Sequence, residues 1–279
     1  MRFNTLEPIK FSVLMCVHRG ENPQHLNLCL ESINSQKLPP DETVLVKDGR
    51  LTPGLEETIG RWKTIFGNKL KTVGLRENIG FAGALNEGLK HCAFDRVARM
   101  DTDDIACPER FREQITFIEK NPGFDVVGAW IDEYDEKMLR RTGCRKVPEL
   151  HEDIIRFARW RSPLNHMSVI YRKEAVLSSG GYPEELIKMQ DYGLWAKLIL
   201  AGCRFHNIPK PLVMVRAGAP LLARRGGLRY CMMELKLLAF LRRIGFQDPW
   251  HLLANGAVRT AVRLMPPALR SAVYRLLRH

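Results

Sequence analysis

Three carboxylates, Asp101, Asp103 and Asp104, stand within four residues of one another and directly follow a short apolar run. Carboxylates this close repel each other unless a cation lies between them. Their hard oxygen atoms suit Mg²⁺ or Mn²⁺, which bind one or two carboxylates together with substrate phosphates. The same residues could form a solvated turn ahead of the helix expected from Pro108, because Asp is common in turns. The run therefore predicts either a divalent-metal site or an acidic turn.

Two further carboxylates stand where apolar runs end or helices begin. Asp48 could accept a hydrogen bond from a base N–H or a ribose hydroxyl, and Gly49 lets the backbone turn sharply after it. Asp-Gly is also an ordinary turn sequence. Asp191 follows Gln190 at the start of an expected helix, where it could be the N-cap. It could equally take a proton from an acceptor hydroxyl.

Small residues mark another candidate segment, which runs from Asn78 to Gly88. They permit the backbone to approach either a ligand or a sheet closely. The segment is not GxGxxG, which disfavours a dinucleotide-binding fold. Farther along, Asn165 and His166 precede an apolar run. His166 could contact a phosphate or substrate, or it could be a structural histidine.

The elements that must position these residues alternate between apolar runs and amphipathic stretches. Strands are expected at 11–17, 43–46, 71–75, 97–100 and 125–131, and helices at 23–35, 55–66, 81–91 and 108–120. This alternation predicts an α/β fold with a mainly parallel sheet and helices on both faces. Ligands of such sheets bind beyond the carboxyl ends of the strands. Val17, Asp48 and the run 101–104 should therefore meet at one edge.

The alternation loosens after about Glu149. Helices are expected at 151–161 and 192–201, with a short one ending near Gly180. Strands are expected at 167–171, 204–208 and 212–215.

Composition restricts the class of protein. The chain is 45% hydrophobic and 27% charged, which is ordinary for a globular protein. Its seven cysteines are odd in number and no two have CxxC spacing. The first residues contain no apolar stretch long enough for a signal peptide. These features predict a cytoplasmic protein with free thiols.

The basic charge is concentrated near the C-terminus. Residues 216–279 hold twelve Arg and Lys against two acids, so 12 − 2 = +10 of the net +12 lies there. His251, Asn255, Arg259 and Arg263 recur every four residues, opposite an apolar side. A second amphipathic stretch follows Pro266-Pro267. Such helices are too short and too charged to span a bilayer, and they lack the aromatic pattern of nucleic-acid binders.

Two interpretations of this basic tail stay open. It could dock on an anionic membrane surface, or it could pack on the core with its arginines outward.

The candidate motifs gain meaning from their order. In chain order they are Ser12–His18, Val46–Gly49, Glu77–Gly80, Asn86–Gly88, Met100–Asp104, Asn165–Met167 and Gln190–Trp195. The series, over about residues 9–216, resembles glycosyltransferase family 2, whose members are inverting enzymes of the GT-A fold. It departs from that family in Cys16-Val17-His18-Arg19, where Pro-x-Tyr-Asn is frequent, and in Lys47-Asp48-Gly49-Arg50, where Asp-Asp-Gly-Ser is frequent. The Gln-x-x-Arg-Trp motif of processive members is missing, which favours single addition.

The resemblance implies a role for particular residues. Val17, Asp48, Asn78 and Asp101 would bind the nucleotide, with Asp48 on the uracil and Asp101 near the ribose and metal. Asp103 would bind Mn²⁺ or Mg²⁺, with Asp104 beside it. Asp191 would be the catalytic base. His166 and Gln190 would stand near the substrate or its phosphates.

The resemblance also implies an activity and a division of the chain. Residues 1–216 would form the GT-A domain, with a nucleotide-sugar half at about 1–104 and an acceptor half at about 105–216, and residues 217–279 would form the helical tail. The enzyme would move a sugar from a UDP-sugar to a glycan or a polyprenyl-diphosphate-linked acceptor at the inner face of the cytoplasmic membrane, as in O-antigen or capsule synthesis. The alternative is a nucleotidyltransferase or a non-catalytic nucleotide-binding protein. No Gly-rich triphosphate loop follows the first strand, which disfavours the former.

Overall fold

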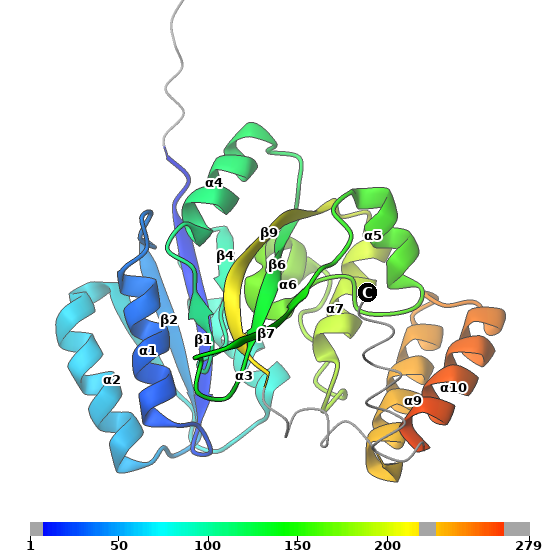
Figure 1. Cartoon of the computed structure of the whole chain (residues 1–279), viewed down its shortest axis with the longest axis horizontal. Coiled ribbons are helices and arrows are strands. Elements are labelled where there is room, and N and C mark those ends of the chain that lie inside the picture. Colours follow the sequence, from blue (N-terminus) through cyan, green and yellow to red (C-terminus); the bar gives the residue numbers. More distant parts are fainter. Residues whose placement is uncertain (1–7, 218–226, 265–279) are drawn as a thin grey trace, which may run out of the picture.

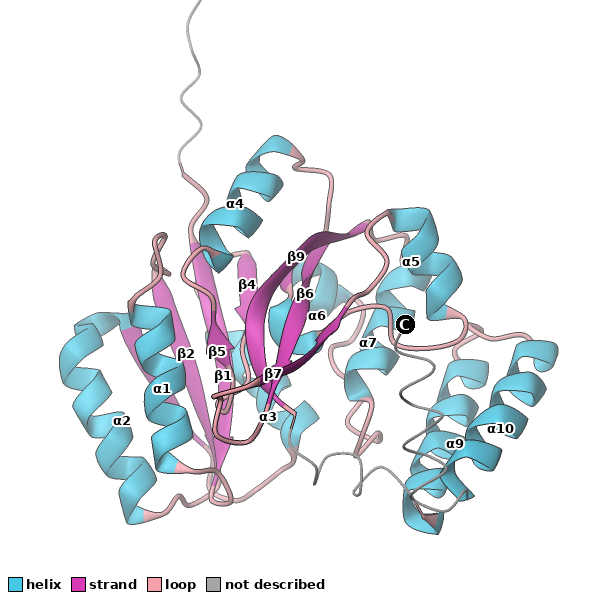
Figure 2. Cartoon of the chain, in the orientation of Figure 1, coloured by secondary structure: helices cyan, strands magenta, loops and turns pink. Residues whose placement is uncertain are grey.

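The computed structural model describes residues 8–217 and 227–264, and a single nine-stranded sheet runs through its centre (Figures 1 and 2). The strand order is β3-β2-β1-β4-β8-β6-β9-β5, and β7 pairs with β6. Helices cover both faces of the sheet. The expected α/β fold class is confirmed.

The first half of the sheet is parallel throughout. It consists of β1 (Phe11–His18), β2 (Glu42–Asp48), β3 (Leu70–Gly74) and β4 (Arg96–Arg99). Each strand lies within two residues of its expected bounds, because a strand buried on both faces reads as a continuous apolar run. All four strands therefore end at the same edge of the sheet.

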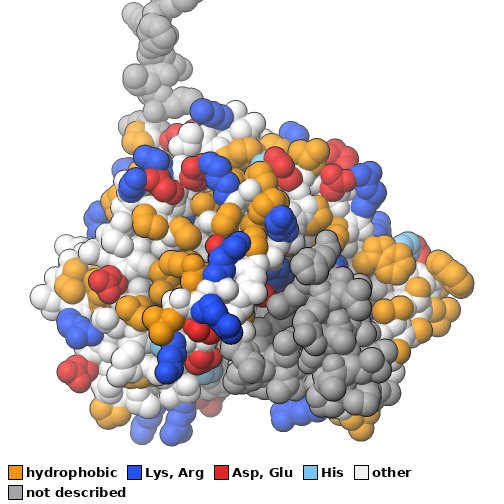
Figure 3. All heavy atoms as spheres, in the orientation of Figure 1, with side chains coloured by type: hydrophobic (Ala, Val, Ile, Leu, Met, Phe, Trp, Pro, Cys, Tyr) orange, Lys and Arg blue, Asp and Glu red, His pale blue; other side chains and the backbone are white. Residues whose placement is uncertain are grey.

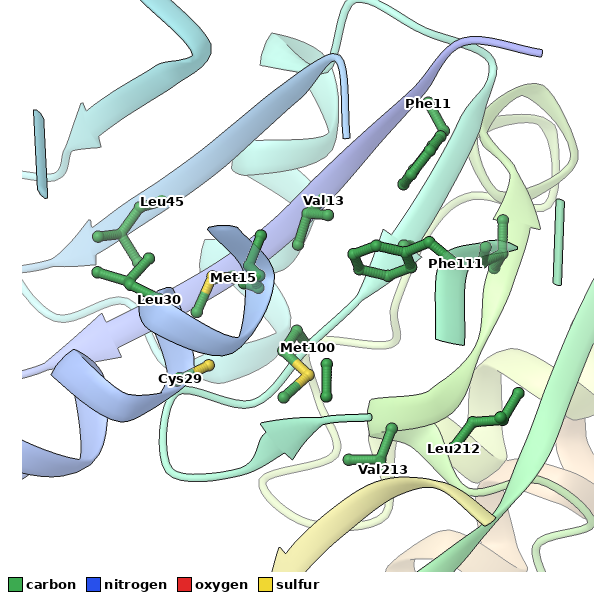
Figure 4. Close-up of a cluster of buried hydrophobic side chains, with 14 of the residues drawn as sticks. Phe11, Val13, Met15, Cys29, Leu30, Leu45, Met100, Phe111, Leu212 and Val213 are labelled. Carbon is green, nitrogen blue, oxygen red and sulfur yellow. The ribbon is translucent and has the colours of Figure 1, made fainter. Parts of the chain in front are cut away.

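Two separate layers of side chains hold the helices to this half. One contains α1 (Pro23–Asn34), α2 (Pro53–Phe66) and α4 (Arg110–Lys120), which pack on alternate residues of β1 such as Val13 and Met15. Figure 4 shows this layer, with Phe111 of α4 facing Phe11 at a ring-centroid distance of 5.1 Å. The other layer places α3 (Phe81–His91) on Leu14. The short η1 (Gly67–Lys69) connects α2 to β3.

The second half of the sheet mixes parallel and antiparallel pairs. It contains β5 (Ile105–Ala106), β6 (Val126–Tyr134), β7 (Arg141–Arg145), β8 (Ile170–Arg172) and β9 (Phe205–Arg216). β8 joins β4 to β6 with antiparallel pairing on both sides, and β9 runs parallel to β6. The expected strands at 204–208 and 212–215 are one strand, whose register shifts opposite Trp130. Pro209 and Pro211 stand at that shift, where proline is tolerated in a sheet.

The remaining helices of this half follow the expected order. They are α5 (His151–Ala158), η2 (His166–Ser168), α6 (Lys173–Ser178) and α7 (Gln190–Leu200). The strand expected from 167 begins instead with η2, which leaves β8 only three residues. None of the described helices is both long enough and apolar enough to cross a bilayer.

Among the described residues, two helices follow the sheet, α9 (Leu228–Arg243) and α10 (Pro249–Leu264). α9 packs Leu237, Phe240 and Leu241 against α7 residues such as Tyr192, in a small third core. This helix therefore belongs to the body of the molecule. The second amphipathic stretch expected after Pro267 lies outside the described residues.

The orientation of α10 is opposite to that of a helix packed on the core with its arginines outward. Its polar stripe faces inward: the Asn255 amide donates to the carbonyl of Arg159 at 3.0 Å, and the Arg259 guanidinium donates to that of Trp160 at 2.6 Å. Its apolar side faces solvent, where Trp250 and Leu253 are 75% and 66% exposed. Figure 3 shows these apolar side chains gathered over α10, at the right of the view. Arg259 also forms an ion pair with the buried acid Glu234 at 3.5 Å, which explains why this polar stripe faces inward.

Candidate active site

The site lies where β1 and β4 separate. β4 pairs with β1 only as far as Leu14, and the last backbone bond between them joins the Met100 N–H to the Leu14 carbonyl at 3.2 Å. β1 continues to His18 beside β2, whereas the segment that follows β4 turns away at Asp101. Connections leave toward β2 on one side and β8 on the other, so this is a topological switch point of the sheet. Ligands of α/β sheets bind at such points.

Asp48 and Asn78 are brought together on the β2 side. The Asp48 carboxylate is buried, and it accepts hydrogen bonds from the Asn78 amide and from the Ile79 N–H, both at 2.8 Å. Gly49 has φ +81°, and a Cβ there would lie 2.9 Å from the backbone N of Asn78. The two loops are thus fixed against each other. Each carboxylate oxygen keeps a lone pair for a ligand.

Val17 and Cys16 stand between Asp48 and the acidic run. The side chain of Val17 is fully buried in the core under α1, so only its backbone can line the cleft. Cys16 points to the opposite face. Burial raises the pKa of the Cys16 thiol to about 12, against the charge of Arg99 and with the charges of Asp48 and Glu21. Arg99, Asp48 and Glu21 therefore all lie near the Cys16 thiol.

Arg99 is a fully buried cation, and sequence reasoning missed it. Its guanidinium forms an ion pair with Asp101 and lies 4.9 Å from the centroid of the Phe81 ring. Burial alone would lower the pKa of Arg99, but Asp101 together with Tyr182, Cys16 and Tyr171 outweighs burial, so the pKa is raised. A charged residue inside the expected strand 97–100 was the available signal. Asp101 therefore already has a cationic partner.

Asp103 and Asp104 lack such a partner. Burial, Asp101 and Glu21 together raise the pKa of Asp103 to about 6. Asp104 is buried, accepts a hydrogen bond from the Arg216 N–H at 3.2 Å, and has its pKa raised well above the usual range by burial and by Asp103. The charges of Arg216 near Asp103 and of Arg99 near Asp104 are outweighed by burial and by the neighbouring carboxylates, a condition that a divalent cation relieves.

Glu21 is a second residue that sequence reasoning missed. It lies in the loop between β1 and α1, 3.6 Å from His18, and burial and Asp101 raise its pKa, against the charge of His18. A single acid in an apparently solvated loop carries no sequence signal.

The carboxylates fit a metal that substrate phosphates help to hold. Among residues 8–217 and 227–264, no group of three or more potential ligands is arranged to hold an ion by itself. Magnesium and manganese sites of phosphate-transfer enzymes commonly use only one or two carboxylates. Asp103 and Asp104 could supply these, because Asp101 is engaged by Arg99.

Asp191 approaches the same cleft from the other half of the sheet. It lies in the first turn of α7, after Met189, which has the left-handed φ of 61° and is itself the N-cap. The interpretation of Asp191 as the N-cap is therefore wrong. Burial raises the pKa of Asp191, whereas the Tyr192 N–H and the charge of Arg145 lower it; Asp101 adds a further rise. Asp101 and Asp191 are thus close enough to affect each other.

His166 lies under the site. Its Nε2 is 2.9 Å from the Tyr182 hydroxyl, and its ring packs edge-on against Phe81 and Trp195. Burial and Arg99 lower the pKa of His166 well below its usual value, so the ring is neutral. Gln190, the first residue of α7, is partly exposed beside Asp191.

A short bridge connects the two halves of the site. The Asn86 side chain donates to the Tyr182 carbonyl at 2.9 Å and accepts from the Tyr182 N–H at 2.7 Å. Gly181 has φ +66°, and a Cβ there would lie 2.5 Å from the Asn86 Oδ1. α3 therefore holds the loop that leads into Asp191.

Comparison with known proteins places this geometry in context. A family model described as Glycosyl transferase family 2 matches residues 12–180. An uncharacterized glycosyltransferase of Haemophilus influenzae is 42% identical over 266 residues, which are 95% of this chain and 98% of that protein. The amylovoran biosynthesis glycosyltransferase AmsE of Erwinia amylovora is 39% identical, over 95% and 97% of the two chains.

A third relative has a named reaction. It is the UDP-Gal:alpha-D-GlcNAc-diphosphoundecaprenol beta-1,3-galactosyltransferase of Escherichia coli, 33% identical over 95% of each chain.

Solved structures agree on the fold. The mannosyltransferase PcManGT of Pyrobaculum calidifontis, in complex with GDP-Man and Mn²⁺, has a TM-score of 0.64 at 19% identity, over 96% of this chain and 80% of that one. S. aureus TarS 1-349 in complex with UDP-GlcNAc has a TM-score of 0.63 at 21% identity, over 84% and 66%. At these identities the likeness establishes the GT-A fold.

Proposed function

This chain belongs to glycosyl transferase family 2, and from that premise we propose that it transfers a sugar, with inversion, from a UDP-sugar to a hydroxyl of a glycan or lipid-linked oligosaccharide. The observation that carries the proposal is the convergence of Asp48, Asp101, Asp103 and Asp191 at one switch point of the sheet. They come from four separate segments of the chain. A non-catalytic nucleotide binder would have no use for the last of them.

The donor would lie across the carboxyl ends of β1 and β2. Asp48, held by Asn78, would accept from the base, and the backbone at Val17 would line the base pocket. Asp101, oriented by Arg99, would bind the ribose. Asp103 and Asp104 would hold Mn²⁺ or Mg²⁺. When bound, that ion neutralises charge on the diphosphate leaving group.

Asp191 would act as the general base. It would remove the proton of the acceptor hydroxyl as the oxygen attacks the anomeric carbon on the face opposite the leaving diphosphate. A single displacement of this kind inverts the configuration. Burial favours the role, because it raises the pKa of Asp191 and so makes the carboxylate a better proton acceptor. Gln190 and His166 would orient the substrate from beside and beneath it.

The acceptor would be attached to a polyprenyl diphosphate at a membrane surface. The E. coli relative acts on a sugar linked to diphosphoundecaprenol, and AmsE is named for amylovoran biosynthesis. The exposed apolar side of α10 would rest on the cytoplasmic membrane, as fits an enzyme of O-antigen or capsule synthesis. We further propose that residues 1–104 bind the donor, residues 105–216 bind the acceptor, and residues 217–279 form the membrane-facing part.

Thermal unfolding tests the donor site. UDP, dTDP, GDP and ATP would each be added with and without Mn²⁺ to the wild type, to Asp103→Ala and to Asp95→Ala. Asp95 precedes the strand that Asp101 follows, so it is a control at the opposite end of β4. A ligand that binds only the folded state raises the melting temperature. We expect a rise with UDP and Mn²⁺ in the wild type and the control alone.

Two other results would change the proposal. A rise with dTDP in place of UDP would keep the enzyme class and change the donor. If none of the four nucleotides shifted the wild type, the donor-site assignment would fail.

A further inference from the structure

A pocket of about 210 Å³ opens between the loop that precedes α7 and the first half of α9. The two helices α7 and α9 lie in the right half of Figure 1. The residues that line the pocket and enter the argument are Leu186, Ile187, Lys188, Arg229, Met232 and Lys236. No step of the proposed mechanism uses this pocket.

The lining combines exposed apolar side chains with cations. Ile187 and Met232 are 69% and 50% exposed. Lys188, Arg229 and Lys236 form no ion pair with any residue in the part of the chain that the structure describes.

The one acid in the lining is already neutralised. Glu185 forms an ion pair with Arg243 of α9, which also fixes the loop to that helix. The pocket therefore presents apolar surface together with three uncompensated positive charges.

The pocket is adjacent to the proposed base. Lys188 is three residues before Asp191, so their Cα atoms are at most about 11 Å apart. The loop is held in place, because Leu186 belongs to the small core with Phe240 of α9 and the bridge from Asn86 fixes Tyr182 at its start. A ligand seated in the pocket could thus present a sugar hydroxyl to Asp191.

We propose that this pocket binds the diphosphate and the first isoprene units of a polyprenyl-diphosphate-linked acceptor. The inference rests on the proposed function and adds a binding site for the acceptor to the proposed binding site for the donor. The three cations match the diphosphate, and Ile187, Met232 and the aliphatic stems of the lysines match the hydrocarbon. A free anion would leave the apolar part unused, and a neutral lipid would leave three charges unpaired.

Binding of farnesyl diphosphate to the full chain tests the proposal. Farnesyl diphosphate carries both chemical features, whereas pyrophosphate and farnesol each carry one. We expect farnesyl diphosphate to bind at least tenfold more tightly than either, also with UDP and Mn²⁺ saturating the donor site. Arg229→Glu/Lys236→Glu should weaken it roughly tenfold or more, since both charges are reversed. Met232→Gln should weaken farnesyl diphosphate and leave pyrophosphate unchanged.

The matched control is Arg242→Glu/Lys63→Glu, which reverses two exposed cations outside the lining. Every variant would also be tested for its melting-temperature rise with UDP and Mn²⁺. If UDP displaces farnesyl diphosphate, the probe occupies the donor site and the pocket assignment is overturned. Equal binding by the charge-reversed and control variants, or none by the wild type, overturns it too. A normal response to UDP in those cases leaves the proposed function standing.

Discussion

At the residue scale, the acidic run is asymmetric. Asp101 is paired with the buried Arg99, whereas Asp103 and Asp104 form no ion pair within the part of the chain that the structure describes. Removing Arg99 would leave a further buried charge unpaired, which commonly costs several kcal/mol. The run therefore contains one carboxylate, Asp101, that is paired with an arginine, and two carboxylates, Asp103 and Asp104, that are not.

This division predicts how Asp103 affects stability without metal. Its folded-state pKa of about 6 exceeds the ordinary value of 3.8, so protonation favours the folded state. That stabilisation is complete below pH 3.8 and is lost as the pH rises through about 6. Asp103→Asn should therefore raise the free energy of unfolding at pH 7.5 by roughly 2 kcal/mol, and by much less at pH 4.5. Urea unfolding of the wild type and Asp103→Asn in EDTA at both pH values measures the free energy of unfolding. A lower value for Asp103→Asn than for the wild type at pH 7.5 would contradict the prediction.

Asp191→Asn separates chemistry from binding. The amide keeps the size of the side chain and cannot accept the proton, so we expect turnover to fall about a hundredfold or more. The melting-temperature rise with UDP and Mn²⁺ should be unchanged. Release of UDP from the cognate donor, followed with Asp153→Asn on the surface of α5 as a control, measures the loss. An active Asp191→Asn enzyme would remove the assignment.

Sequence reasoning selected polar residues that are recognisable by their type and by their position next to an expected strand or helix. Asp48, Asp101 and Asp191 each stand at the end of an apolar run or the start of a helix. The charges of Asp48 and Asp101 both act on Cys16, and that of Asp101 acts on Asp191, while the roles of the three residues stay predictions. Sequence reasoning missed Arg99 and Glu21, whose roles depend on which charges fold beside them. It also could not orient Val17, since the face of a strand that a residue takes depends on neighbouring strands.

At the element scale, the close approach of α3 to the sheet depends on Gly88. A Cβ there would lie 2.4 Å from Val46 Cγ2 and 2.6 Å from Leu14 Cδ1. The tight helix–sheet packing considered for the segment Asn78 to Gly88 is therefore confirmed at its last residue. Because α3 also carries Asn86, its depth in the layer sets the position of the loop before Asp191.

Gly88→Ala should destabilise the fold. Overpacking of this kind costs about 1–3 kcal/mol, which lowers the melting temperature by several degrees in a domain of this size. Gly60→Ala in α2 is the matched control, because nothing lies within 4 Å of its Cβ position. The control should gain up to about 1 kcal/mol from helix propensity. Scanning calorimetry of both variants measures the change in melting temperature. Equal changes in the two variants would contradict the prediction.

The elements that were missed share a physical cause. β5 has two residues and β7 is polar and largely exposed, so neither has an apolar period to detect. The antiparallel insertion of β8 between β4 and β6 is a long-range pairing that local patterns do not encode. The packing of α9 on the body of the protein was missed because its basic residues, which suggested a tail, are interspersed with its buried residues.

At the scale of the whole molecule, α10 reverses the usual arrangement of an amphipathic helix. Its polar residues bind the body of the protein, and Trp250, Leu253 and Val258 face solvent. Truncation near residue 219 would also remove α9 and uncover Tyr192, so a truncated chain is a poor test of membrane binding. Point variants of the exposed stripe avoid this difficulty.

Trp250→Ser/Leu253→Ser/Val258→Ser should abolish most binding to liposomes. Burying such side chains contributes about 1.5–3 kcal/mol each, so their loss should reduce the floated fraction at least tenfold. Ile65→Ser/Leu139→Ser, which alters exposed apolar residues elsewhere, should float like the wild type. Flotation on vesicles of phosphatidylglycerol and phosphatidylethanolamine measures this. Equal flotation of the two variants would exclude the stripe as the contact.

The single sheet also limits how such an enzyme can change over evolutionary time. β8 of the proposed acceptor half is hydrogen-bonded to β4 of the proposed donor half on one side and to β6 on the other. Neither half could be exchanged between relatives as an independent module, because the cut would break the ladder from Arg96–Arg172 to Ala98–Ile170. New sugar and acceptor preferences would therefore arise by substitution within the loops at the cleft, and a library for redesign should be confined to them.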